Sequence, residues 1–271
     1  MSRAVYVYGV LSTPGARTSS PAIDAWSGNV LGTGIDARAI EVLVAGELSA
    51  LVSSTTGNPI ARSRRHLLDH TSVLERAMRH ATILPLRFGT VAPDEAALIA
   101  CIAANGAAFL QALHDIDGRV ELGLKASWRK GRVFNDIVER DHALRQMRDK
   151  LQTRPAGETY YERIELGRRV EAALAERRAA EAAAIIAELA PLAERAADLR
   201  THDEDMILNR AFLVPRTAET AFDEAVARIA ERYGERMDFR YVGPVPPFNF
   251  VTLHAGWLTA PSPAHSRSGA A

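Results

Sequence analysis

Apolar residues follow two spacings along the chain, a period of two that predicts strands and a wider period that predicts helices. The clearest alternation covers residues 120–128, where every second residue is apolar. Residues 4–11 are rich in Val and Tyr and predict the first strand. The apolar runs 40–45 and 48–53 lie on either side of Gly46 and predict a β-hairpin. Strands are therefore expected in both halves of the chain.

Helical spacing is clearest over residues 62–81, where one face is apolar and the other charged. The residues expected on the apolar face are Leu67, Leu74, Met78 and Ala81. Pro93, Asp94 and Glu95 predict the start of another helix, which continues to about residue 113. Further helices are predicted at residues 135–152, 158 to about 200 with a kink or restart at Pro191, and 217–233. Two more strands are predicted at residues 206–214 and 237–242.

The predicted elements mix without strict βαβ alternation, which favours an α+β fold with two domains. A polar turn at residues 114–118 separates an N-terminal α+β domain, residues 1–116, from a second domain, residues 117–243. The second domain resembles a ferredoxin-like sandwich that lacks one strand and carries a long helical insertion. Residues 244–271 form a tail rich in proline and aromatic residues that packs back on the domains, and its last ~10 residues are expected to be disordered.

Residues 84–90, with the sequence Leu-Pro-Leu-Arg-Phe-Gly-Thr, predict an apolar strand interrupted by Pro85. Because proline has no N–H for the ladder, this strand is expected at a sheet edge or at a strand start. Alternation places Arg87 opposite its apolar neighbours, including Phe88, where a covered guanidinium needs a partner. Two interpretations stay open, a structural ion pair with an acid such as Glu121 and an anchor that joins domain, tail and partner.

The tail begins with the segment Gly-Pro-Val-Pro-Pro-Phe-Asn-Phe at residues 243–250. Its prolines end the preceding strand and favour an extended, polyproline-like path. The aromatic and aliphatic residues that follow are too apolar for a free tail, so we expect them to dock in a groove between the domains. The candidate interaction or interdomain residues are Arg87, Phe88, Pro246, Pro247, Phe248 and Phe250.

Composition excludes several classes of protein. The chain has 271 residues, of which 47% are hydrophobic and 24% charged, and its 33 basic and 33 acidic residues give a formal net charge of zero. This balance does not favour nucleic acid or an anionic membrane as partner, and no stretch has the length of a membrane span. The single cysteine, Cys101, is expected to be a small buried residue in a reducing cytoplasm.

The sequence predicts no catalytic, cofactor or metal site. His66 and His70 are four residues apart on a predicted helix, but no third ligand is indicated and a solvated face is the simpler interpretation. The glycine-rich segment 28–34 lacks the lysine of a phosphate-binding loop and is expected to be a linker. Asp203 and Asp205 are expected in a solvated turn, with a cation site as the alternative.

Several motifs, in this order and over nearly the whole chain, resemble those of the gas vesicle GvpL/GvpF family. They are Tyr-Val-Tyr-Gly-Val at 6–10, residues 84–90, Glu-Leu-Gly-Leu-Lys at 121–125, Gly157 with Tyr-Tyr-Glu-Arg at 160–163, Asn-Arg-Ala-Phe-Leu-Val at 209–214, and the Gly-Pro-x-Pro-Pro-x-x-Phe ending. The chain departs from the family pattern at Val245, where an aromatic is usual, and at Phe248-Asn249, where Tyr-Ser is usual.

The resemblance implies a non-enzymatic gas vesicle accessory or assembly protein. Such a protein acts with the hydrophobic shell subunit and other accessory proteins of the vesicle, in the cytoplasm or as a minor vesicle component. No cofactor, nucleic acid or lipid membrane is implied. The alternative is a small-molecule ligand-binding protein or enzyme that uses a cleft between the domains.

Overall fold

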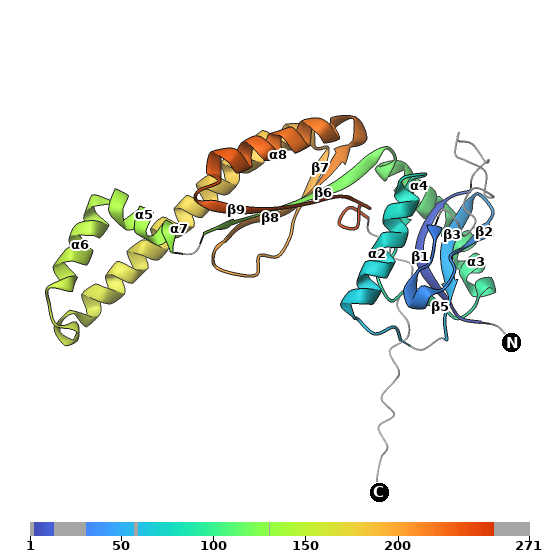
Figure 1. Cartoon of the computed structure of the whole chain (residues 1–271), viewed down its shortest axis with the longest axis horizontal. Helices are drawn as coiled ribbons and strands as arrows, with labels where there is room; N and C mark the ends of the chain where they lie inside the picture. Colours follow the sequence, from blue (N-terminus) through green and yellow to red (C-terminus); the bar gives the residue numbers. More distant parts are fainter. Residues whose placement is uncertain (1–2, 14–30, 57–58, 130, 252–271) are drawn as a thin grey trace, which may run out of the picture. The chain divides into compact units, whose positions relative to one another are not determined.

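The computed structural model of the chain describes residues 3–13, 31–56, 59–129 and 131–251. Contacts within the chain divide it into two compact units, which are drawn in Figure 1. The first unit contains Met1–Val120 and Val245–Ala271, and the second contains Glu121–Pro244. The tail is thus grouped with the N-terminal residues. Residues 28–30 of the segment 28–34 lie outside the described residues, as does the tail after residue 251, which includes the last residues predicted to be disordered.

The first unit is built on an antiparallel sheet with the order β2-β3-β1-β4, in which β5 also pairs with β1. Its strands are β1 (Val5–Ser12), β2 (Glu41–Ala45), β3 (Leu48–Ser54), β4 (Ile83–Pro85) and β5 (Val91–Ala92). Strands β2 and β3 form the predicted hairpin, with Ala45 paired to Leu48. Gly46 in the turn has φ +70°, which glycine adopts without strain. The first strand and the hairpin are therefore confirmed.

The strand predicted at residues 84–90 is shorter in the structure. Strand β4 ends at Pro85 and, among the described strands, pairs only with β1, so it lies at the edge of the sheet as the proline predicted. The Leu86 N–H still donates to the Tyr8 carbonyl, at 2.9 Å, before the chain leaves the sheet. Residues from Arg87 to Thr90 form a loop that leads to β5, so the alternation assumed for Arg87 does not apply.

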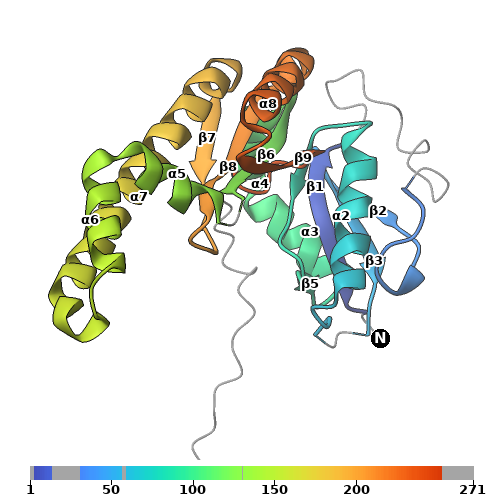
Figure 2. The same ribbon diagram turned by 60° about the vertical axis from the view of Figure 1, so that its left-hand side comes forward.

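Helices cover both faces of this sheet (Figure 2). One face is covered by α2 (Arg64–Met78), and the other by α3 (Glu95–Ala104) and α4 (Gly106–Ile116). Tyr6 and Tyr8 of β1 contact α2 through His70. The core on the other face combines valines of β1 with side chains of β3, α3 and α4, including Val5, Val10, Val52, Leu98, Ile102, Phe109 and Leu113.

The single helix predicted from residue 93 to about 113 is two helices. Asp94 caps α3 as expected, because its Oδ1 accepts from the Ala97 N–H at 2.7 Å. The chain then bends by 75° at Asn105, whose amide bonds the Cys101 carbonyl at 2.9 Å. Among the described helices, no single one is long and apolar enough to cross a membrane. The bent pair reaches that length and composition together, and its Leu98 and Phe109 are fully buried in the core.

The apolar face of α2 is rotated relative to the prediction. Leu67 is 44% exposed and the helix ends before Ala81, although both residues were expected in the core. Leu74 and Met78 are buried as predicted. The remaining buried residues of the helix are His70, Val73 and Ala77. A histidine thus occupies a core position, which apolar spacing alone does not predict.

Gly9 lies where β1 approaches β4 most closely. A Cβ added there would lie 2.8 Å from the Leu84 carbonyl oxygen and 2.9 Å from the side chain of Ile83. Because one of these atoms is backbone, the two strands would have to separate. We expect Gly9→Ala to lower the free energy of unfolding by about 2 kcal/mol in urea denaturation. Gly106→Ala, where nothing lies within 4 Å, is the control, and equal stability of both variants would contradict the close approach.

The second unit contains a four-stranded sheet with the order β7-β8-β6-β9. Its strands are β6 (Arg119–Trp128), β7 (Arg195–Asp198), β8 (Met206–Pro215) and β9 (Met237–Val245). Helix α8 (Glu219–Tyr233) and part of α7 (Tyr160–Leu189) cover one face (Figure 1). Phe222 of α8 packs on Phe212 of β8, with ring centroids 5.2 Å apart. The strand predicted from alternation at residues 120–128 is confirmed.

A helical insertion lies between β6 and β7 in the chain. It consists of α5 (Arg132–Arg140), α6 (His142–Gln152) and the first half of α7, packed around Ile137, Val138, Leu144 and Val170. The helix predicted at residues 135–152 is broken at Asp141, whose carboxylate accepts from the N–H of Ala143 and of Leu144. Short 3-10 turns lie at Ile35–Ala37, Ala156–Thr159, Ala190–Leu192 and Arg216–Ala218.

Two boundaries in the second unit differ from the prediction. The long helix expected to reach about residue 200 ends at Leu189, and Arg195–Asp198 is a strand that pairs with β8. The strand that the prediction counted as missing is therefore present. Strand β9, which was expected to end at residue 242, continues through Pro244 to Val245.

Candidate interaction site

Aromatic rings from four segments meet between the sheet and α2 of the first unit. Tyr6 and Tyr8 come from β1, His70 from α2, Phe88 from the loop after β4, and Phe248 from the tail. The His70 ring is stacked on Tyr8 at 5.6 Å, edge-on to Phe88 at 5.8 Å, and 6.4 Å from Phe248. We call these five residues the aromatic cluster. The two stretches singled out in the sequence are thus brought to the same histidine.

A chain of hydrogen bonds fixes the loop to this cluster. The Gly89 N–H donates to the Tyr6 hydroxyl at 3.0 Å, and that hydroxyl lies 2.9 Å from His70 Nδ1. His70 Nε2 lies 3.1 Å from the Leu86 carbonyl oxygen. A carbonyl only accepts, so Nε2 carries the proton and Nδ1 accepts from the Tyr6 hydroxyl. The neutral imidazole therefore satisfies every member of the chain.

Burial sets the protonation of the cluster. It lowers the pKa of His70 to about 4, and the bond to the Leu86 carbonyl opposes this only in part. Burial also raises the pKa of Tyr6 and of Tyr8, against the hydrogen bonds that these hydroxyls receive. All three groups are neutral near pH 7, and their polar atoms are occupied within the protein. The cluster is therefore suited to holding the loop after β4 and the tail in place.

The tail packs on the first unit in a compact turn. Its Phe248 N–H donates to the Pro246 carbonyl at 2.7 Å, and the Phe250 N–H donates to the Pro247 carbonyl at 3.2 Å. Both prolines and Phe250 are buried, and Phe248 is half-buried. Val251 packs against the core of the unit. The path is therefore a turn at this point, where the prolines predicted an extended segment.

Arg87 lies beside this cluster but outside it. Its side chain is exposed and makes no ion pair with a described residue of the first unit, and the pairing with an acid such as Glu121, which belongs to the second unit, stays a prediction. Its carbonyl accepts from the Thr90 N–H at 3.2 Å and from the Thr90 hydroxyl at 2.6 Å. These two hydrogen bonds close the loop, and the Arg87 guanidinium faces solvent.

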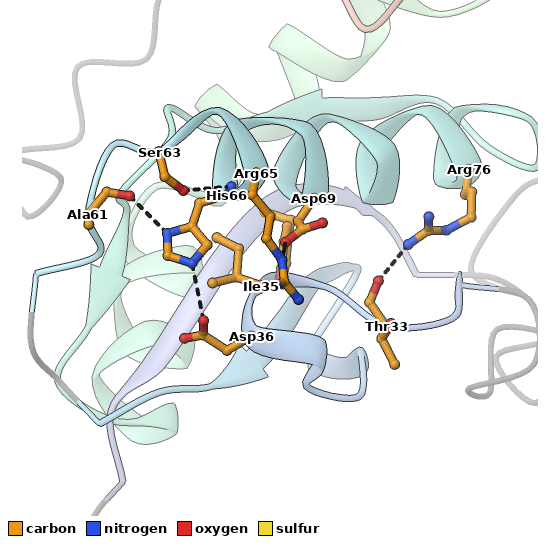
Figure 3. A network of polar contacts seen from close by, with 10 residues as sticks. Thr33, Ile35, Asp36, Ala61, Ser63, Arg65, His66, Asp69 and Arg76 are labelled. Atoms are coloured by element: carbon orange, nitrogen blue, oxygen red, sulfur yellow. Dashed lines mark hydrogen bonds and ion pairs between the residues drawn. The ribbon is translucent and has the colours of Figure 1, made fainter.

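The two histidines of α2 have separate partners, so they do not form a metal pair. His66 Nδ1 lies 2.9 Å from the Ala61 carbonyl and its Nε2 lies 3.1 Å from Asp36 Oδ1 (Figure 3). His70 is only 2% exposed, so the solvated face expected for it is wrong. In the part of the chain that the structure describes, no group of three or more His, Cys, Asp or Glu is placed to hold a metal. Cys101 is half-buried, less than predicted.

The second unit contains a groove that the sequence did not predict. Its volume is about 740 Å³, and it lies along the middle of α7, beside α5 and the end of β6. Its walls include Trp128, Phe134, Leu166, Val170, Leu174 and Arg178. The Arg178 guanidinium lies over the Trp128 ring at 5.2 Å. The residues on α7 share one helical face, but only the fold brings α5 and β6 beside them.

Comparison with known proteins gives one consistent result. Residues 4–252 match the model of the family described as gas vesicle synthesis protein GvpL/GvpF. The chain belongs to the GvpL/GvpF family. "Gas vesicle protein F" of a Streptomyces strain is 31% identical over 250 residues, which cover 92% of this chain and 99% of that protein. The protein of the same name from a Nostoc strain is 28% identical, over 93% of this chain and 100% of the relative.

The fold agrees with this assignment. The crystal structure of GvpF from Anabaena superposes with a TM-score of 0.79 and 27% identity, covering 93% of this chain and 99% of that one. The α+β class predicted from the sequence is therefore shown, as is a role connected with gas vesicles. These relatives are named as gas vesicle proteins, and nothing in their names favours the alternative of a ligand-binding protein or enzyme.

Proposed function

We propose that this protein is a non-enzymatic assembly factor of the gas vesicle. It binds the hydrophobic shell subunit, other accessory proteins, or both, in the cytoplasm during vesicle formation, and it can stay in the vesicle as a minor component. The observation that carries the proposal is the family match from residue 4 to residue 252, over nearly the whole chain. The resemblance in several separate motifs supports the same role.

The physical task of such a factor is to cover apolar surface of the subunit before assembly, which suppresses aggregation. Two features of the protein suit this task. Strand β2 is the outer strand of the first sheet and carries Val44, which is 44% exposed, so an extended segment could add to this edge. The groove of the second unit offers apolar walls, among them Phe134, which is 50% exposed.

We assign the partner-facing role in the first unit to the loop around Arg87 and Phe88 together with the tail residues from Pro246 to Phe250. Arg87 presents a charge to solvent, while the aromatic cluster fixes the loop behind it. In the second unit we assign residues 117–243 to a modified ferredoxin-like domain. The strand order β7-β8-β6-β9 and the helices α7 and α8 on one face support that assignment.

Co-purification with the shell subunit tests the proposed function. Tagged protein and the major shell subunit would be expressed in the same cytoplasm, beside a tagged variant that lacks residues 245–271. We expect soluble subunit with the full chain, none with an unrelated tagged protein, and a loss with the truncated variant if its circular dichroism is native. Failure to recover subunit that is itself soluble would exclude direct binding to it.

A further inference from the structure

A basic and apolar surface lies at the start of α2, on the outer side of the helix. We call it the α2 outer surface and define it as Arg62, Arg64, Arg65, Leu67 and Leu68, all of which are exposed. Leu68 is 57% exposed, and the Arg65 side chain is 76% exposed. Arg64, Leu67 and Leu68 follow helical spacing, so they lie on one face. Helical spacing thus places Arg64 and Arg65 on either side of Leu68, with Leu67 beside Arg64.

The fold itself does not require these residues. Arg65 makes a long ion pair with Asp69, at 3.9 Å, and neither Arg62 nor Arg64 has an ion pair with any described residue. The first turn of α2 contains no acid, although the positive end of a helix dipole is stabilised by acids and opposed by arginines. Exposed leucines add nothing to the core. Side chains that oppose the helix dipole or expose apolar surface, without a compensating contact in the fold, are typical of a functional surface.

Hydrogen bonds fix the start of α2 to neighbouring segments, and Figure 3 draws these contacts. Ser63 caps the helix, its hydroxyl accepting from the His66 N–H at 3.1 Å. The His66 ring connects Ala61 to Asp36, and Arg76 donates to the Thr33 carbonyl at 2.9 Å further along the helix. The arginines and leucines therefore project from a fixed backbone, which lowers the entropy lost when a partner binds.

We propose that the α2 outer surface binds an acidic segment of another protein, folded as an amphipathic helix with glutamates or aspartates beside leucine-like side chains. The carboxylates would pair with the three guanidiniums, which suit two-point recognition, and the apolar face would cover Leu67 and Leu68. The chain's own tail does not fit, because residues 252–271 contain no Asp or Glu. A phosphate backbone would leave the leucines uncovered, and two leucines give little depth for a membrane.

Titration of a labelled peptide with the full chain tests this surface. The probe is a helical peptide with leucines on one face and glutamates on the other, followed by fluorescence anisotropy. We expect the double variant R64E/R65E to weaken binding by at least about tenfold. The control, R228E/R240E, makes the same change in net charge at two exposed arginines of the second unit and should bind normally. Leu68→Ser should weaken binding without any change in charge.

Stability separates this result from misfolding. Glutamates in the first turn favour the helix dipole and offset the loss of the Arg65–Asp69 pair, so R64E/R65E is expected to keep the thermal midpoint of the wild type while it removes binding. Equal binding of a peptide with lysines in place of glutamates would overturn the proposal. So would equal binding by R64E/R65E and the control, or binding of DNA or anionic vesicles without binding of the acidic peptide. None of these outcomes bears on the gas vesicle role proposed above.

Discussion

Acidification from about pH 6.5 to about pH 4 is expected to remove about 3 kcal/mol of folding free energy through His70 alone. Burial lowers the pKa of this histidine from 6.5 to about 4. Between these values the unfolded chain takes up a proton that the folded chain does not. The stabilisation is therefore fully present above about pH 6.5 and is lost as the pH falls toward 4. The difference of about 2.5 pH units, at about 1.4 kcal/mol each, gives the expected size.

The prediction has a geometric cause. A second proton on His70 would fall on Nδ1, which accepts from the Tyr6 hydroxyl, and the Gly89 N–H already donates to that hydroxyl. To accept from the charged ring, the Tyr6 hydroxyl would have to turn its own proton away from Nδ1, so that proton would lose its acceptor in a site where His70 is 2% exposed. The loop from Leu86 to Gly89 should be the first segment to open.

Urea denaturation of the wild type and of His70→Gln across this pH range measures the effect. The variant should be less stable at pH 7 but lose less stability on acidification, because it has no imidazole to protonate. His66→Gln removes a histidine one turn away that is only half-buried. This variant should lose as much free energy of unfolding on acidification as the wild type does. If the free energy of unfolding falls equally with pH in the wild type and in His70→Gln, the folded structure does not disfavour protonation of His70.

His70 also marks the limit of what the sequence could predict. Alternation and turn residues located the strand at residues 120–128 and the hairpin at Gly46, because each signal is local. The burial of His70 depends on Tyr6, 64 positions away, and on the Leu86 carbonyl. Leu67 is more apolar than His70, but the sheet packs against the face of α2 that carries His70. Spacing along α2 does not contain that information.

The errors in helix and strand boundaries have related causes. Asn105 ends α3 with a side-chain hydrogen bond to the Cys101 carbonyl, and the Asp141 carboxylate caps the start of α6, so both predicted continuous helices are broken. Residues Arg195–Asp198 have a helical composition, yet they pair with β8 because Pro191 has already ended α7. The sheet partner overrides local propensity at this position. The groove beside α7 was missed for the same reason, since its walls come from separate segments.

The second large effect is expected for Phe250→Ala, which should release the tail from the first unit. Phe250 is 6% exposed, and loss of such a ring from a packed site costs about 3–5 kcal/mol. Because the ring lies near the end of the described chain, the tail can detach while the sheet stays folded. The loss should therefore appear as local opening and leave global unfolding nearly unchanged.

Hydrogen exchange of the Phe248 and Phe250 amides, whose bonds to Pro246 and Pro247 hold the turn, measures this opening directly. We expect their protection to fall by at least about a hundredfold, as local openings of this energy imply. Phe134→Ala makes the same substitution at a ring that is 50% exposed and should leave these amides unchanged. Unchanged protection in Phe250→Ala would mean that Phe248 and the prolines hold the tail without it.

The same variant separates two explanations for a loss of shell subunit in the truncated protein. Phe250→Ala keeps every other residue of the tail but weakens its docking next to His70 and Phe88. If co-purification falls in both variants, the partner requires the docked tail. If it falls only after removal of residues 245–271, the partner binds the tail as a free segment, and our assignment of the Arg87 loop to the interaction is wrong.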